Sequence, residues 1–213
     1  MRDVYHEELD SIGSTLIEMT GLVGTAMSRA TTALLDADLQ VAEAVISGDD
    51  AVDALQQELD GRALDLLARQ QPVAGDLRTI ITSLRMSADI ERMGDLARHI
   101  AKVARLRYPD SAVPEVLRDT IAEMGRIAVD LAQKAGEVIE GRDVYTARSL
   151  PEEDDAMDIL HRKLFGDLLD KKAEYSTETA IDVTLIGRYY ERYADHAVSV
   201  ARRLIFLVTG EQN

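Results

Sequence analysis

The sequence predicts an all-α fold made of two tandem, internally repeated, antiparallel three-helix bundles. Apolar residues recur at spacings of three and four along both halves of the chain, and no stretch alternates with the period of two that a strand would give. The second half also repeats motifs of the first half in the same order. The repeat is roughly 100 residues long, far beyond the ~20 to 50 residues of solenoid units, so each half is expected to form a bundle of its own.

The first half contains three expected helices, over residues 3–36, 38–70 and 75–107. The first helix has an apolar seam with helical spacing throughout: Leu9, Ile12, Leu16, Met19, Val23, Ala26 and Ala30. Pro72 predicts a turn before the last helix, because proline fits the start of a helix and not its interior. Gly48 is followed by two aspartates, whose charge favours a helix N-terminus, so the middle helix is expected to be broken near its start.

The second half repeats this pattern, with helices expected over residues 115–141, 143–173 and 177–208. Its first helix has the same kind of seam: Leu117, Ile121, Met124, Ala128, Leu131, Ala135 and Val138. Pro151 stands just before a run of four carboxylates, which is typical of a first helical turn. A break near the start of this middle helix is therefore expected as well.

The two halves are expected to be separate domains, over residues 1–108 and 115–210. Pro109 and Pro114 bracket a short segment that is the best candidate for a linker. The middle helices match across this division, because residues 49–55 read DDAVDAL and their counterparts in the second half read DDAMDIL.

The composition excludes several classes of protein. Acidic residues number 39 against 24 basic ones, for a net charge of −15, which repels nucleic acid and anionic lipid. Cysteine is absent, so disulfides, thiol catalysis and cysteine metal sites are excluded. The first ten residues contain no apolar signal core, and no apolar run approaches the ~20 residues that a membrane helix needs. We expect a soluble cytoplasmic protein that does not bind nucleic acid.

The last helix of each half carries an acidic pair at the same place. Residues 90–97 read IERMGDLA and residues 190–197 read YERYADHA, so Glu91 and Asp95 in one helix correspond to Glu191 and Asp195 in the other. Within each pair the acids are four residues apart and project from one helix face.

Each of these helices also has an apolar stripe that is expected to face the core. The stripes consist of Ser83, Met86, Ile90, Met93, Ala97, Ile100 and Ala104 in the first half, and Val183, Ile186, Tyr190, Tyr193, Ala197, Val200 and Leu204 in the second. At about 100° per residue, the acids lie more than about 90° from the centre of the stripe. They are expected on an outward face, more exposed than buried.

The sequence allows two interpretations of the acidic pairs. The first is an ordinary solvated surface, with Arg98 and Lys102 screening one pair and Arg188 and Arg192 the other. The second is a cation site, because acids four residues apart repel by ~0.2–0.5 kcal/mol and a bound cation would turn that repulsion into coordination. Mg²⁺, Mn²⁺, Ca²⁺ and iron all accept carboxylate oxygens. Two acids cannot complete such a shell, so water, backbone carbonyls or a second chain would supply the remaining ligands.

No other catalytic pattern stands out, and the chain is not expected to be an enzyme. The Glu-x-x-His signature of di-iron bundles is missing, because Gly94 and Ala194 occupy the histidine positions. Phosphate-binding loops, dinucleotide fingerprints and the nucleophile elbow of hydrolases are absent from the sequence. His99 is expected at the surface, and the tyrosines at 189, 190 and 193 in the core or an interface.

With these motifs in register over nearly its whole length, the chain resembles the PhoU family of bacterial phosphate-transport regulators. Residues 70–78, QQPVAGDLR, are similar to the start of that family's third helix, and the two acidic motifs are similar to its repeated Glu/Asp-x-x-x-Asp motifs. Gly48, Asp49, Asp50 and Asp53 add to the resemblance. The family often has Asn four residues after the motif Asp; this chain departs from it with His99 and Ser199, which leaves the identity and presence of a metal open.

The resemblance implies two three-helix bundles, a homodimer and a cytoplasmic location, with the membrane reached only through partners. It also implies a negative regulator of phosphate uptake and phosphate-starvation signalling. Such a protein restrains the phosphate-specific ABC transporter, through its ATPase subunit, and holds the sensor histidine kinase in its repressing state when phosphate is plentiful. Some members carry metal ions or multi-iron clusters on the acidic motifs, which implies Glu91, Asp95, Glu191 and Asp195 as metal ligands here.

Two alternatives of other classes remain at this point. One is a helical bundle that stores or oxidises iron. The other is a purely structural interaction protein whose acidic faces bind basic surfaces.

Overall fold

The computed structural model of the chain describes residues 2–70, 74–170 and 175–211. In chain order its elements are α1 (Arg2–Asp36), α2 (Leu39–Gly48), α3 (Asp50–Gln70), α4 (Ala74–Arg107), the 3₁₀ helix η1 (Glu115–Leu117), α5 (Arg118–Gly141), α6 (Val144–Leu168) and α7 (Thr177–Thr209). These described ranges contain no strand, and the all-α prediction is confirmed.

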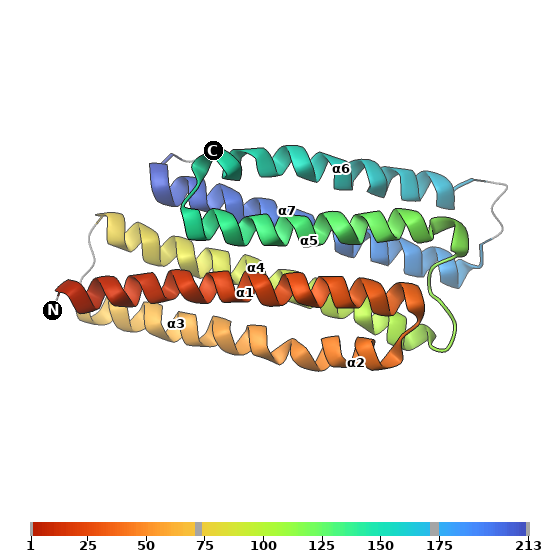
Figure 1. Ribbon diagram of the computed structural model, residues 1–213, viewed down its shortest axis with the longest axis horizontal. Helices are drawn as coiled ribbons and strands as arrows, with labels where there is room; N and C mark the ends of the chain where they lie inside the picture. The colour runs from red at the N-terminus through yellow and green to blue at the C-terminus, as the bar shows by residue number, and fades with distance from the viewer. Residues whose placement is uncertain (1, 71–73, 171–174, 212–213) are drawn as a thin grey trace.

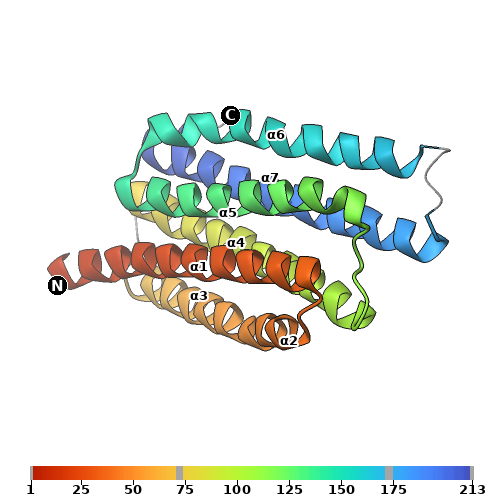
Figure 2. The same cartoon turned by 45° about the vertical axis from the view of Figure 1, so that its right-hand side comes forward.

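The helices form two bundles that lie side by side along the long axis of the molecule (Figures 1 and 2). One bundle consists of α1, α4 and the α2–α3 pair, and the other of α5, α6 and α7. The bundles meet where α1 packs on α5 and α4 packs on α7, while α3 and α6 lie at the outer edges. The predicted pair of repeated three-helix bundles is confirmed, and the exact domain limits at 108 and 115 stay a prediction.

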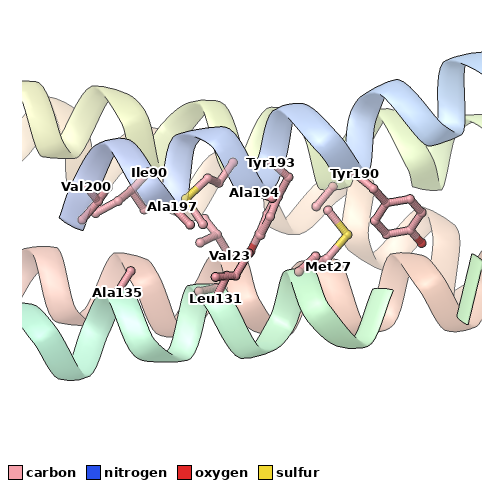
Figure 3. Close-up of a cluster of buried hydrophobic side chains, with 14 of the residues drawn as sticks. Val23, Met27, Ile90, Leu131, Ala135, Tyr190, Tyr193, Ala194, Ala197 and Val200 are labelled. Atoms are coloured by element: carbon pink, nitrogen blue, oxygen red, sulfur yellow. The ribbon is translucent and has the colours of Figure 1, made fainter. Parts of the chain in front are cut away.

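The four central helices bury the predicted stripes completely. Every member of the two stripes on α4 and α7 is buried, including the large side chains of Tyr190 and Tyr193. Figure 3 shows Tyr193 extending from α7 towards Val23 of α1 and Leu131 of α5. The largest aromatic side chains of the core therefore lie where the two halves meet, and burial of such rings supplies much of the packing energy.

Helix starts repeat between the halves as well. The side chain of Asp38 accepts a hydrogen bond from the Val41 backbone N–H at 3.0 Å, and Asp143 accepts one from Tyr145 at 2.9 Å. Each aspartate caps the helix that follows a long first helix, and each cap satisfies a backbone donor at a helix N-terminus. The repeat thus extends from the core pattern to individual caps.

The middle helices differ, and one prediction about them is wrong. The first half is broken as expected, because α2 ends at Gly48 and α3 begins at Asp50. In the second half α6 runs without a break from Val144 to Leu168, with Pro151 inside it. Proline removes one backbone hydrogen bond. Buried side chains on both sides of it, Ala147, Leu150 and Met157, pack against the bundle and keep the helix continuous.

Candidate functional site

The acidic pair of α4 lies against the junction between α2 and α3. The Glu91 side chain is 19% exposed and the Asp95 side chain 14%. The prediction of an outward, exposed face is wrong for this pair, because α4 packs against α1 and α7 and is also covered by α2 and α3. We call Asp49, Asp53, Glu91 and Asp95 the first acidic face.

Asp49 is the most deeply placed member of this face. It is buried at the α2–α3 junction, and its Oδ1 lies 3.0 Å from the point where a Cβ at position 94 would stand. Gly94 therefore leaves the space that the carboxylate uses. Burial raises the pKa of Asp49, the Arg98 guanidinium works against that rise, and the charge of Asp53 adds to it.

The first acidic face contains its own cation. Nη1 of Arg98 lies 2.7 Å from Oδ2 of Asp49, and the same guanidinium donates through Nη2 to Asp95. Arg92 donates to the other oxygen of Asp95 at 2.8 Å. Burial raises the pKa of Glu91, and the charge of Asp95 raises it further. Arg98 thus screens this face as predicted, whereas Lys102 makes no ion pair with any described residue.

The corresponding second acidic face consists of Asp154 and Asp158 on α6 and Glu191 and Asp195 on α7. Glu191 is 15% exposed and accepts hydrogen bonds from Arg188 at 2.5 Å to both oxygens, while Asp195 is exposed as predicted. Burial raises the pKa of Asp154 to about 6, with further contributions from the charges of Asp195 and Asp158. Burial and the charge of Asp195 also raise the pKa of Glu191.

Few hydrogen bonds or positive charges offset the negative charge of the carboxylates in the second face. Within the described ranges, no hydrogen bond or ion pair reaches the side chains of Asp154, Asp158 or Asp195. Arg192, which was expected to screen this pair, is exposed and forms no ion pair with a described residue. The second face is therefore the more negative local environment.

A histidine that sequence reasoning left aside lies beside the second face. The ring of His161 on α6 packs against Gly187 of α7, where an added Cβ would stand 3.3 Å from Cδ2 of the ring. Gly187 and Glu191 are one turn apart on the same side of α7, so the imidazole lies next to the Glu191 carboxylate. Its Nε2 is buried without a hydrogen-bond partner, and the ring contacts Phe165 edge-on at 4.9 Å between centroids.

The histidines of α4 and α7, His99 and His196, point away from the carboxylates of the acidic faces. Nδ1 of His99 is 2.6 Å from the Asp95 carbonyl oxygen of its own helix, and its ring lies 5.3 Å from that of Tyr189. His99 is half-buried instead of fully at the surface, because Tyr189 of α7 packs against its ring. His196 instead contacts Asp89 of α4, with 3.1 Å between Nδ1 and Oδ1.

The donor set suits a divalent cation, although it is not assembled into a closed cage. Carboxylate oxygens are ligands for hard cations, and imidazole adds affinity for transition metals. Among the residues that the structure describes, no three His, Asp or Glu side chains converge as ligands of a single ion. Each face contains one buried polar atom without a hydrogen-bond partner, Oδ2 of Asp49 beside the Arg98 guanidinium and Nε2 of His161 beside α7.

The sequence predicted only half of each acidic face as site residues. The missing members, Asp49 with Asp53 and Asp154 with Asp158, have the same four-residue spacing as the pairs that were named. That spacing on the middle helices was the available signal. His161 had none, because its counterpart in the first half is Gln56.

Comparisons with known proteins agree with the fold and its repeat. The PhoU domain profile matches residues 16–104 and again 121–204. The chain is 52% identical over 210 residues to the phosphate-specific transport system accessory protein PhoU homolog 2 of Mycobacterium tuberculosis, covering 99% of both chains. It is 30% identical over 214 residues to the PhoU homolog of Rhizobium meliloti, covering 98% of this chain and 88% of that one.

Solved structures are similar over the same length. The phosphate transport system regulatory protein PhoU from Streptococcus pneumoniae superposes with a TM-score of 0.89 at 26% identity, covering 98% of this chain and 99% of that one. PhoU from Pseudomonas aeruginosa gives a TM-score of 0.85 at 28% identity, covering 97% and 100%. No helix in the described part of the chain is long and apolar enough to cross a membrane. Two domain matches and full-length relatives together show that this chain belongs to the PhoU family.

Proposed function

We propose that this protein is a negative regulator of phosphate uptake and phosphate-starvation signalling. The observation that carries the proposal is the 52% identity, over 99% of both chains, to a phosphate-specific transport system accessory protein. The relatives are named as accessory or regulatory proteins, which agrees with a role that involves no catalysis. The chain acts in the cytoplasm as an adaptor, and it works through helical surfaces.

The partners that we propose are the ATPase subunit of the phosphate-specific ABC transporter and the sensor histidine kinase. Regulation of both lets one protein couple uptake to gene expression. The net charge of −15 disfavours direct contact with anionic lipid, so membrane association takes place through these partners. A homodimer is the form that we expect.

Deletion of the gene tests this role. Phosphate-starvation genes should be expressed, and phosphate uptake should rise, in medium rich in phosphate. Mycobacterium tuberculosis has two proteins of this family that match the chain, named homolog 1 and homolog 2, so any second copy should be deleted together with the first. Expression of the intact chain should restore repression. Unchanged uptake and gene expression in the double deletion would contradict the proposal.

We further propose that the acidic faces bind a divalent cation such as Mg²⁺, Mn²⁺ or Ca²⁺, or iron. Support comes from carboxylates that are gathered at equivalent places in both halves and from the raised pKa values of Glu91, Glu191 and Asp154. Like charges held together in this way favour a bound cation. With water as the remaining ligand, binding is weak and exchangeable.

A charge-neutral variant of the four motif acids tests cation binding. The changes Glu91→Gln, Asp95→Asn, Glu191→Gln and Asp195→Asn keep the shape of each side chain, and the positions lie off the core stripe, so helical content should be retained. Binding measured by calorimetry should fall. Replacement of the exposed Glu137 and Glu140 by Gln provides the control, which should bind like the parent.

Two further assays separate this proposal from its alternatives. Oxidation of ferrous iron by the purified chain would favour an iron-oxidising bundle. Partner binding that is indifferent to chelators would favour a structural role for the acidic faces.

A further inference from the structure

The two sides of the molecule differ in charge. The sequence of α4 contains seven basic and four acidic residues and that of α7 contains four of each, so the two helices together have a net charge of +3. The chain as a whole has −15. On the opposite side of the molecule, α1 has two basic and six acidic residues, and α5 has three and five. This acidic protein therefore has a positive side, formed by α4 and α7 (Figures 1 and 2).

Five exposed arginines lie on the outward surface of α4 and α7, and we call them the arginine face: Arg85, Arg92, Arg188, Arg192 and Arg202. Arg85 and Arg92 are seven residues apart and Arg202 follows Arg188 by fourteen, so both spacings are close to whole helical turns. The buried stripes of both helices face α1 and α5, and α4 packs against α7. The exposed arginines of the two helices therefore share one surface.

Three of these arginines have no carboxylate partner among the residues that the structure describes. Arg92 and Arg188 pair with carboxylates of their own helices. No ion pair within the described ranges reaches Arg85, Arg192 or Arg202. A guanidinium group donates from a planar fork that matches the two oxygens of a carboxylate. The surface thus offers donors that fit the carboxylates of another molecule.

The arginine face also has exposed apolar side chains at both of its ends. Leu77 and Ile81, near the start of α4, are 41% and 37% exposed, and Ile181 and Leu185, near the start of α7, are 55% and 40% exposed. Because α4 and α7 run antiparallel (Figure 1), the two pairs lie at opposite ends of the face. Exposed apolar patches mark interaction sites, and arginine is enriched at protein interfaces. A matching partner has both carboxylates and apolar side chains.

The charge around the face restricts what can bind there. Carboxylates of Glu91, Asp95, Glu191 and Asp195 lie on the outer flanks of α4 and α7, and Asp195 is exposed. A broad anionic surface such as a bilayer would meet these carboxylates, whereas a narrow partner would not. Nucleic acid and polyphosphate offer no aliphatic side chains to the ends of the face. A second copy docked with two-fold symmetry would place arginine against arginine. A single acidic helix avoids these conflicts.

We propose that the arginine face is the docking surface for an acidic amphipathic helix of a partner protein. The helix lies along α4 and α7, with its carboxylates on the arginines and its apolar side chains on the ends of the face. Arg188 and Arg202 are about 21 Å apart along the axis of α7, so a helix of about 15 to 20 residues covers the face. This inference rests on the proposed adaptor role and adds the surface through which the adaptor holds a partner.

The first experiment measures binding of a designed peptide to the purified chain by fluorescence anisotropy. The peptide is a labelled helix of about 20 residues, with leucine at spacings of three and four and glutamate on both sides of the leucine stripe. A matched peptide has glutamine in place of glutamate. The glutamate peptide should bind about tenfold more tightly, and a rise in NaCl from about 0.05 M to about 0.5 M should remove most of the difference. Equal binding of the two peptides, or no binding, would overturn the proposal.

The second experiment locates the bound peptide. The variant Arg85→Gln/Arg192→Gln/Arg202→Gln removes the three guanidinium groups that have no partner, and it should weaken binding of the glutamate peptide by about tenfold. Its helical content should be retained, because the three side chains are exposed. If this triple variant fails to fold, Arg192→Gln alone should weaken binding by about two- to fivefold. Parent affinity in the folded variants would overturn the location.

The control variant is Arg29→Gln/Arg62→Gln/Arg148→Gln. It makes the same change in net charge at exposed positions of α1, α3 and α6. It should bind the glutamate peptide like the parent. A loss equal to that of the triple variant would show that the peptide responds only to the net charge of the chain, and the assignment to the arginine face would be wrong.

Two further measurements test other occupants of the face. Light scattering should give the same molar mass for the parent and the triple variant. A parent dimer that the triple variant loses would make a second copy of the chain the occupant. Vesicles of phosphatidylglycerol should bind neither protein. Vesicle binding by the parent that the triple variant loses would make anionic lipid the occupant. Either result would overturn the choice of an acidic helix.

Expression in the deletion strain separates this inference from the proposed regulatory role. The intact chain and the control variant should restore repression of phosphate-starvation genes, and the triple variant should not. Failure of the intact chain would contradict the regulatory role, while the peptide experiments would still decide the docking surface. Full repression by the triple variant, at the cellular level of the intact chain, would overturn the docking role of the arginine face and leave the regulatory role standing.

Discussion

Tyr190 of α7 donates a hydrogen bond to Thr31 of α1, with 2.7 Å between the two hydroxyl oxygens. The Thr31 hydroxyl donates its own proton to the Met27 carbonyl at 2.9 Å, which leaves its lone pair for the phenol. Burial raises the pKa of Tyr190, so the phenol stays protonated and keeps its role as donor. This contact joins the first helix of one half to the last helix of the other, inside the core.

Replacement of Tyr190 by Phe should destabilise the protein by about 0.5–1.5 kcal/mol, the usual net value of a buried hydrogen bond. Thr31 retains its bond to Met27, so no buried donor is orphaned and the loss stays modest. Tyr193 provides the control, because its buried hydroxyl has no hydrogen-bond partner. Tyr193→Phe should be neutral or stabilising in urea denaturation. Equal losses for the two variants would show that the hydrogen bond between Tyr190 and Thr31 contributes no stability of its own.

Gly125 on α5 should not tolerate a larger residue. A Cβ there would stand 2.6 Å from Cγ2 and 2.7 Å from Oγ1 of Thr31, whose side chain is stiff and already hydrogen-bonded. Gly125→Ala should therefore lower the free energy of unfolding by about 1–3 kcal/mol, the range for overpacked cores. Gly61→Ala, in the exposed middle of α3 with open space around it, should instead stabilise by up to ~1 kcal/mol. Denaturation midpoints of the two variants should move in opposite directions.

Asp89 should contribute stability that depends on pH. Burial opposes its ionisation, but hydrogen bonds with His196 and from Arg203 outweigh burial and hold the pKa of Asp89 below its ordinary value of 3.8. A carboxyl with a lowered folded-state pKa stabilises the fold fully above its unfolded pKa, and the effect is lost as pH falls through the folded value. Asp89→Asn should cost about 1.5–3 kcal/mol near neutral pH, as expected for hydrogen bonds to a charged group.

The measurement for Asp89 compares parent and variant unfolding in urea at several pH values. The difference in free energy should be present at about pH 5, and it should shrink as the pH falls below 3.8. A difference that grew as the pH fell below 3.8 would contradict the assigned direction of the pKa shift.

The sequence by itself determined the helices, the repeat and the core stripes of α4 and α7. Regular spacing of apolar residues such as Met86, Ile90 and Met93 reports one buried face of a helix, and that face was buried as predicted. The same pattern placed Tyr190 and Tyr193 in the core. These features follow from local periodicity, so a single sequence was enough to predict them.

Other features depended on residues that are distant in the chain. The apolar stripe predicts only one buried side for α4. Other helices cover α4 from several directions, so Glu91 and Asp95 are mostly buried. Pro151 predicted a break in the helix, but side chains that pack on both sides of it keep α6 continuous.

The chemistry of the acidic faces was decided only by the tertiary structure. The sequence shows acids at equivalent places in both halves, and it assigned Arg98 only to the surface of its own helix. The fold brings Asp49, from the α2–α3 junction, to 2.7 Å from that guanidinium, and it brings His161 of α6 against Gly187 of α7. Contacts between helices depend on how the helices cross, and the order of residues along one helix carries no record of that crossing. Two faces with the same motif therefore have different charged and polar neighbours.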